Sequence, residues 1–139
     1  MRLCKALLMV VIGLSLQACS TVYRQAGLDR APRSEVAVIE LASCGDNCPI
    51  IQAIDGKWRG VGAFKEYELK LGVRNVKFIY RDGGFSGSRG LIVSFDAKRG
   101  AIYGVRANAD HSRQMWNPEI VDNSTGEVVS TLIGSGIAY

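Results

Sequence analysis

Short runs of alternating apolar and polar residues follow one another along most of the chain. They lie at residues 35–42, 50–54, 63–71, 73–81, 91–96, 101–108, 115–122 and 127–133. A period of two is typical of β-strands with one face in a core, whereas no window of ten or more residues within 34–139 keeps the 3.6-residue period of a helix. Seven or eight short strands predict an all-β domain, an antiparallel sandwich over residues 34–139.

The boundaries of these runs carry residues that favour turns. Asp55-Gly56 ends the run at 50–54, and Lys98-Arg99-Gly100 separates two later runs. The stretch 123–126 predicts a last hairpin between 115–122 and 127–133.

The run at 63–71 predicts a strand with one exposed face. Tyr67 and Leu69 fall on one side, and Glu66 and Glu68 fall on the other. The two carboxylates are then about 7 Å apart. That spacing suits an acid pair and equally suits a solvated strand face.

The first residues have the character of a signal peptide, predicted over residues 1–18. Arg2 and Lys5 precede an apolar run at 6–16 that is too short to cross a bilayer, which takes about 20 residues. The end of the run, Leu16-Gln17-Ala18-Cys19, resembles the lipobox of bacterial lipoproteins.

The lipobox resemblance implies that the chain is cut before Cys19. In that family the cysteine sulfur carries a diacylglycerol and the new amino group is acylated. Ser20 follows the cysteine, and in the family a residue other than aspartate there usually implies sorting to the outer membrane. The alternative is an ordinary signal peptide, with Cys19 a chance residue or a disulfide partner.

Residues 19–33 contain few apolar side chains and are predicted to be a flexible tether between the lipid and the domain. About fourteen flexible residues reach on the order of 20 Å.

The charge balance excludes one class of partner. The chain has 17 Lys and Arg against 13 Asp and Glu. Removal of residues 1–18 takes away Arg2 and Lys5, which leaves 15 against 13 and a formal charge of +2. A nearly neutral domain with mixed charges gives no electrostatic basis for binding nucleic acid.

Cys44 and Cys48 enclose the turn-forming residues 45–47. Because secreted proteins meet an oxidising compartment, the pair is predicted to form a structural disulfide. The alternatives are free thiols or redox chemistry, although the spacing is C-x-x-x-C and not C-x-x-C. His111 is the one histidine, so two cysteines do not complete a zinc site, and neither a metal nor a cofactor is predicted.

A resemblance concerns the middle of the chain. It is carried by Ile54-Asp55-Gly56, by Tyr67-Glu68-Leu69 with Leu71-Gly72, and by Val76, Phe78 and Tyr80. These runs resemble the "IDG … L-x-P-G-x-H-x-V" pattern of the PEGA-type and prealbumin-like small β-sandwiches of cell-envelope proteins. Leu71 stands where proline is typical, so the turn lacks that rigid residue.

Farther along, residues 95–100, 103–105, 116–122 and 125–129 resemble a group of small proteobacterial outer-membrane lipoproteins. The two resemblances together cover about residues 36–130. They imply a β-sandwich in the cell envelope and carry almost no information about function.

No stretch predicts a catalytic centre. Asp110-His111-Ser112 holds the residue types of a hydrolase triad, but sequence neighbours cannot by themselves adopt its geometry, so a solvated loop is expected. The glycine-rich stretch 83–90 lacks the G-K-[ST] ending of a phosphate-binding loop and is expected to be a hairpin loop.

The binding candidates combine an aromatic residue with cations, a mixture enriched at binding hot spots. They are Trp58 with Lys57 and Arg59, and Phe85 with Arg89. The alternative for Trp58 is a place in the core.

The expected protein is therefore an outer-membrane lipoprotein that faces the periplasm and acts as a binding or structural module. It would contact an envelope protein or a glycan such as peptidoglycan. The alternatives are an accessory subunit that pairs through a strand edge and a small periplasmic hydrolase.

Overall fold

The computed structural model describes residues 22–41, 44, 48–82, 85–86, 90–110, 112–113 and 115–136. These residues form strands joined by short loops, with one turn of 3-10 helix at Arg33–Glu35. The strands are β1 (Val22–Arg24), β2 (Ala37–Glu40), β3 (Ile50–Ile54), β4 (Lys57–Trp58), β5 (Glu66–Leu69), β6 (Gly72–Ile79), β7 (Arg81–Asp82), β8 (Phe85–Ser86), β9 (Gly90–Ala97), β10 (Ile102–Asp110), β11 (Met115–Asp122) and β12 (Thr131–Gly136).

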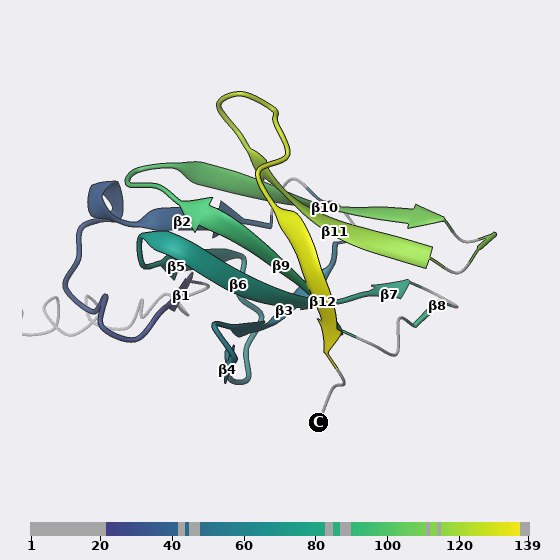
Figure 1. Cartoon of the computed structure of the whole chain (residues 1–139). Helices are drawn as coiled ribbons and strands as arrows, with labels where there is room; N and C mark the ends of the chain where they lie inside the picture. The colour runs from purple at the N-terminus through teal and green to yellow at the C-terminus, as the bar shows by residue number, and fades with distance from the viewer. Residues whose placement is uncertain are drawn as a thin grey trace, which may run out of the picture.

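Two five-stranded sheets form the domain (Figure 1). One sheet has the order β1-β5-β2-β10-β11 and the other the order β12-β9-β6-β3-β4, while β7 and β8 form a separate pair. The predicted all-β sandwich is confirmed, and most neighbouring strands are antiparallel. Two pairs, β1 with β5 and β2 with β10, are parallel.

The core lies between the sheets and follows the alternation of the sequence. Val76 and Phe78 on β6 are buried, as are Tyr103 and Val105 on β10. Three successive residues of β2, Ala37, Val38 and Ile39, are buried, so both faces of this strand are covered. Side chains from both sheets thus fill one core, because each strand turns its apolar positions toward the opposite sheet.

The turn at Asp55-Gly56 has the backbone that its sequence predicts. Both residues have positive φ, 50° at Asp55 and 76° at Gly56. Such a pair is typical of the type I′ turn, whose twist matches that of the strands it joins. The turn directs β4 back along β3, with Trp58 opposite Ala53.

The segment predicted to be a tether differs from the prediction. Val22–Arg24 forms β1 and pairs with residues 66–68 of β5, so the ordered domain includes residues before position 34. Tyr23 packs against the core, and its ring lies 5.5 Å from that of Tyr67. A flexible tether therefore does not describe residues 22–24.

The exposed face predicted for β5 is also wrong. Glu68 is 3% exposed, and its register partner on the neighbouring β1 is Arg24. Arg24 forms an ion pair with Glu68, and Arg33 forms ion pairs with Glu66 and Glu40. Arginines of the predicted tether thus neutralise the strand carboxylates.

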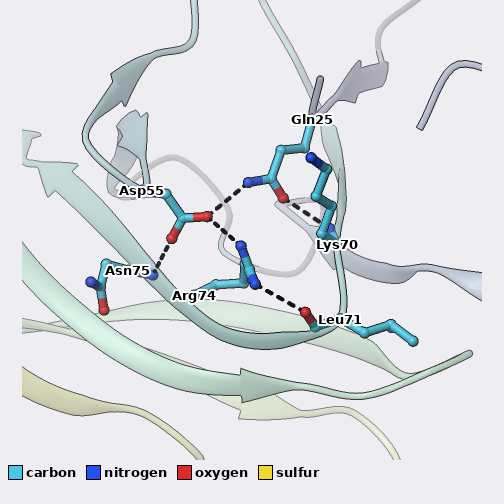
Figure 2. Close-up of polar contacts among 6 residues, drawn as sticks. All are labelled: Gln25, Asp55, Lys70, Leu71, Arg74 and Asn75. Carbon is cyan, nitrogen blue, oxygen red and sulfur yellow. Dashed lines mark hydrogen bonds and ion pairs between the residues drawn. The ribbon is translucent and has the colours of Figure 1, made fainter. Parts of the chain in front are cut away.

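A polar clip fastens the residue after β1 to both sheets (Figure 2). The Gln25 amide donates from Nε2 to Asp55 Oδ2 (2.8 Å), and its Oε1 accepts from the Lys70 N–H (2.9 Å). Arg74 donates to the same Asp55 oxygen (2.7 Å), and the Asn75 N–H donates to Oδ1 (2.9 Å). The clip holds the N-terminal segment against the β3–β4 turn.

The hairpin predicted for the last two runs forms only beside its turn. There Val128 bridges Val121, the Asp122 N–H donates to the Glu127 carbonyl (2.9 Å), and the Val129 N–H donates to the Ile120 carbonyl (2.9 Å). Farther along, the prediction is wrong, because β11 pairs with β10 whereas β12 pairs with β9 in the other sheet. After Ser130 the chain crosses to the other sheet, where β12 forms the edge strand next to β9 (Figure 1).

Candidate functional site

The 57–65 segment (Lys57 to Lys65, KWRGVGAFK) links β4 at the edge of one sheet to β5 in the other. It contains three cations and no acidic residue. Trp58 is 67% exposed and Val61 is 90% exposed. The core alternative for Trp58 is therefore excluded, and the segment presents apolar and cationic side chains to solvent.

Arg59 stabilises the conformation of the 57–65 segment through two contacts within it. Its NH1 donates to the Gly62 carbonyl (2.6 Å), and its guanidinium carbon lies 5.3 Å from the centre of the Phe64 ring. Gly60 has a φ of 83°, a left-handed conformation that glycine adopts readily. The loop thus folds back so that a cation stacks on its own aromatic residue.

A pocket of about 290 Å³ opens beside this segment. Arg59 and Phe64 form part of its wall, and Tyr67 contributes from β5. The remaining lining residues are Leu41, Cys48, Pro49, Ile50, Gly62 and Ala63. The walls are mostly apolar with one charged group. The volume is at the lower limit for small-molecule sites, about 300–1,000 Å³, so the pocket fits a single side chain or small group.

Three aromatic rings, from β1, from the 57–65 segment and from β5, pack together in this region. Tyr23 lies 5.6 Å from Phe64, edge to face, and Phe64 lies 6.0 Å from Tyr67. Burial raises the pKa of the Tyr67 hydroxyl, and the charge of Arg59 opposes that shift. Tyr67 therefore stays neutral at ordinary pH and provides a polar edge to an apolar surface.

Cys44 and Cys48 form the predicted disulfide. Cys48 lines the pocket, and Cys44 packs against the core. The bridge thus ties Cys48, which lines the pocket together with Pro49 and Ile50, to the core residue Cys44.

The second predicted binding pair is not described at the level of side chains. Phe85 belongs to β8, which pairs with β7, and Arg89 lies outside the described residues. The predicted lipidation site, Cys19, also lies outside them. Of the five binding candidates, the structure places Lys57, Trp58 and Arg59 together on one segment.

The hydrolase alternative rests on Asp110, His111 and Ser112. Ser112 donates its hydroxyl to Asp110 Oδ1 (2.6 Å), and the Ser112 N–H donates to the same oxygen (3.0 Å). Both residues are exposed, and His111 lies outside the described residues. These contacts close a turn between β10 and β11, as expected for a solvated loop.

The carboxylates of Glu66 and Glu68 are held in ion pairs with Arg33 and Arg24. In the part of the chain that the structure describes, no group of three His, Cys, Asp or Glu side chains is arranged to hold a metal ion.

Sequence reasoning missed the contributions of Tyr23, Leu41, Phe64 and Tyr67 to the site. The alternation at 63–71 placed Tyr67 in the core, but nothing local to the sequence brings Tyr23 beside it. One available signal was the aromatic residue at position 64, six residues after Trp58 and within the same run of cations.

No helix among the described residues is long and apolar enough to cross a membrane. The comparisons with known proteins found no protein family, no curated protein and no solved structure that matches this chain. The resemblance to small envelope β-sandwiches and outer-membrane lipoproteins therefore stays a prediction.

Proposed function

We propose that this protein is a lipoprotein of the outer membrane that faces the periplasm and acts as a binding or structural module of the cell envelope. One observation supports binding most directly. An exposed tryptophan, Trp58, stands on a cationic segment beside an apolar pocket that contains Arg59. Such aromatic and arginine side chains are enriched among the residues that dominate binding energy.

The pocket also indicates the kind of group that binds there. Its apolar walls favour a hydrophobic group, and Arg59 favours a negative charge at its rim. Because the pocket is small, the remainder of the ligand lies over the exposed surface of Trp58 and Val61. A larger envelope component with an apolar and an anionic part meets both requirements.

The anchoring half of the proposal is tested at Cys19. The mature protein should begin at Cys19 and carry the mass of a diacylglycerol and an acyl chain. Cys19→Ser should leave a longer, unprocessed precursor. A mature N-terminus at another residue, without lipid, would contradict the anchor.

The binding half is tested by titrating the purified mature protein with two probes, a disaccharide tetrapeptide from peptidoglycan and phosphatidylglycerol vesicles. At least one probe should shift the amide NMR signals of residues 57–67, and Trp58→Ala should abolish the shift. Val73→Ala is the matched control, because Val73 is 65% exposed on β6 and outside the site. If neither probe affects these residues, binding at this site is excluded for both classes of ligand.

A second candidate function is an accessory subunit that pairs through a strand edge. β12 lies at the edge of its sheet, and Leu132 and Ile133 on it are exposed. The register shift between Leu132 and Gly134 leaves Ile133 outside the pairing with β9. Ile133→Lys should then release a co-purifying envelope protein, whereas Val73→Lys should not.

A further inference from the structure

The structure places the start of the ordered domain next to the 57–65 segment. Val22, the first residue of β1, pairs with Glu66, which directly follows that segment in the sequence. Tyr23 packs edge to face on Phe64, which belongs to the segment. The N-terminal end of β1 and the exposed cationic segment therefore lie on the same part of the molecule.

A lipid on Cys19 would hold the N-terminal end of β1 close to the membrane. Two residues, Ser20 and Thr21, separate Cys19 from Val22, so three steps of at most about 3.6 Å each give a reach of roughly 11 Å. β1 itself is fixed by its pairing with β5, by the Arg24–Glu68 ion pair and by the Gln25 clip. The domain consequently cannot move far from a bilayer that holds Cys19.

The 57–65 segment, next to the N-terminal end of β1, has the composition of a surface that contacts a membrane interface. Trp58 and Val61 are the large exposed apolar residues of the segment, and Lys57, Arg59 and Lys65 are its cations. Tryptophan favours the headgroup region of a membrane, and long basic side chains reach anionic headgroups from its edge. Each such cation strengthens binding to an anionic surface about fivefold.

From this juxtaposition we infer that the 57–65 segment docks on the anionic surface of the membrane that holds the lipid, with Trp58 and Val61 in the headgroup region and Lys57 and Lys65 on phosphates. The inference rests on the proposed function, since lipidation of Cys19 brings the segment to the bilayer. The partner is the phospholipid surface, and the bound groups are the phosphate and the upper part of an acyl chain.

The test uses the mature protein reconstituted into vesicles, either of phosphatidylcholine alone or with about a third phosphatidylglycerol. Trp116→Phe leaves Trp58 as the only tryptophan, because the chain has two. In anionic vesicles, phospholipids brominated on the acyl chain should quench Trp58, and iodide in the water should quench it several-fold less than in the detergent-solubilised protein. A Trp58→Phe chain, in which Trp116 alone emits, gives the background. If Trp116→Phe does not fold, the difference in quenching between the unaltered protein and Trp58→Phe reports on Trp58.

The cations are tested by the double variant Lys57→Gln/Lys65→Gln. Quenching by brominated lipid should fall several-fold in anionic vesicles, and raised salt should produce the same loss in the unaltered protein. The matched control is Lys98→Gln/Arg99→Gln, which removes two exposed cations from the turn between β9 and β10 and should leave quenching unchanged. An equal loss in both double variants would show a general charge effect and overturn the inference.

Failure of the anchor and failure of the docking surface give different results. If the N-terminus carries lipid and Trp58 remains open to iodide, the docking surface is wrong and the anchor stands. If the N-terminus carries no lipid, sedimentation with anionic vesicles decides the docking surface. Sedimentation that depends on Lys57 and Lys65 then supports it, and its absence rejects both. A protein or glycan photo-crosslinked from position Val61 in cells, with no lipid adduct, would also overturn it.

Discussion

Arg24 on β1 places its Nε 2.8 Å from Oε2 of Glu68, whose side chain is 4% exposed. Glu68 Oε2 accepts no hydrogen bond, because the angles at this contact are unfavourable. Arg24 and Glu68 are therefore held by the attraction of their opposite charges. A buried carboxylate is tolerated only when an opposite charge accompanies it. Through Arg24, β1 therefore supplies the positive charge that the buried Glu68 carboxylate on β5 requires.

Arg24→Ala should lower the free energy of unfolding by about 1–3 kcal/mol, because Glu68 then stays buried without its partner. The loss is smaller than for a fully buried pair, since Arg24 is 44% exposed and water replaces part of its effect. Chemical denaturation measures the change. Glu68→Gln in the same chain should recover most of it.

The matched control for Arg24 is Arg99→Ala. Arg99 pairs with Glu35, and both side chains are exposed, so its loss should cost less than about 1 kcal/mol. Equal costs for the two arginines would contradict the special role of Glu68.

Trp58→Ala should change the melting temperature by less than about 3 °C, because surface substitutions rarely alter stability by more than 0.5 kcal/mol. Trp116→Ala is the matched control. Trp116 packs against the core and stacks on Tyr80 at 5.4 Å, so its truncation should cost about 3 kcal/mol and roughly 10 °C. A large fall for Trp58 alone would show that it has a structural role.

Cys44 and Cys48 should both resist alkylation when the protein is isolated without a reductant. After reduction, both should be labelled, and the midpoint of urea unfolding should fall by an amount equal to about 2 kcal/mol or less. The value is small because the bridge closes a short loop. Full labelling before reduction would contradict the disulfide.

Asp55→Asn should remove part of the pH dependence of stability. Burial alone would raise the pKa of the Asp55 carboxyl, but the hydrogen bonds from Asn75, Arg74 and Gln25 outweigh it and hold the pKa below its ordinary value. The stabilisation is therefore complete above the unfolded pKa of about 3.9 and is lost as the pH falls through the lower, folded value.

The difference in unfolding free energy between wild type and Asp55→Asn should thus be largest above about pH 5 and should shrink toward pH 2. Asparagine is the suitable replacement, since it tolerates the positive φ of 50° at this position. Denaturation curves at a series of pH values give the result. A difference that is constant with pH would exclude the ionised carboxylate as its cause.

The strands and the core could be predicted where a single local pattern decides the outcome. Val76 and Phe78 alternate with polar residues, and the period of two alone places them inside. Asp55-Gly56 specifies its own turn. These features depend on side chains within a few residues of one another, which is the range over which a sequence pattern carries information.

The neighbours of a strand could not be predicted in the same way. Glu66 and Glu68 alternate like residues of an exposed face, and only the pairing of β1 with β5 reveals that one of them is covered. The final strand poses the same problem, because the turn at 123–126 predicts a hairpin with β11 but gives no sign that the chain leaves β11 after Ser130 and pairs with β9. The pocket shares this limit, since Leu41, Arg59 and Tyr67 meet only through tertiary packing.

The parallel pairing of β1 with β5 also fixes an order of events during biogenesis. Val22–Arg24 is synthesised first, but its partner, residues 66–68, follows only after three other strands have been made. Until then the N-terminal segment cannot dock, and closing so long a loop comes late in folding. An enzyme that cuts the chain before Cys19, as proposed, would therefore act while β1 is still undocked, and docking of β1 would later bring the proposed lipid closer to the domain.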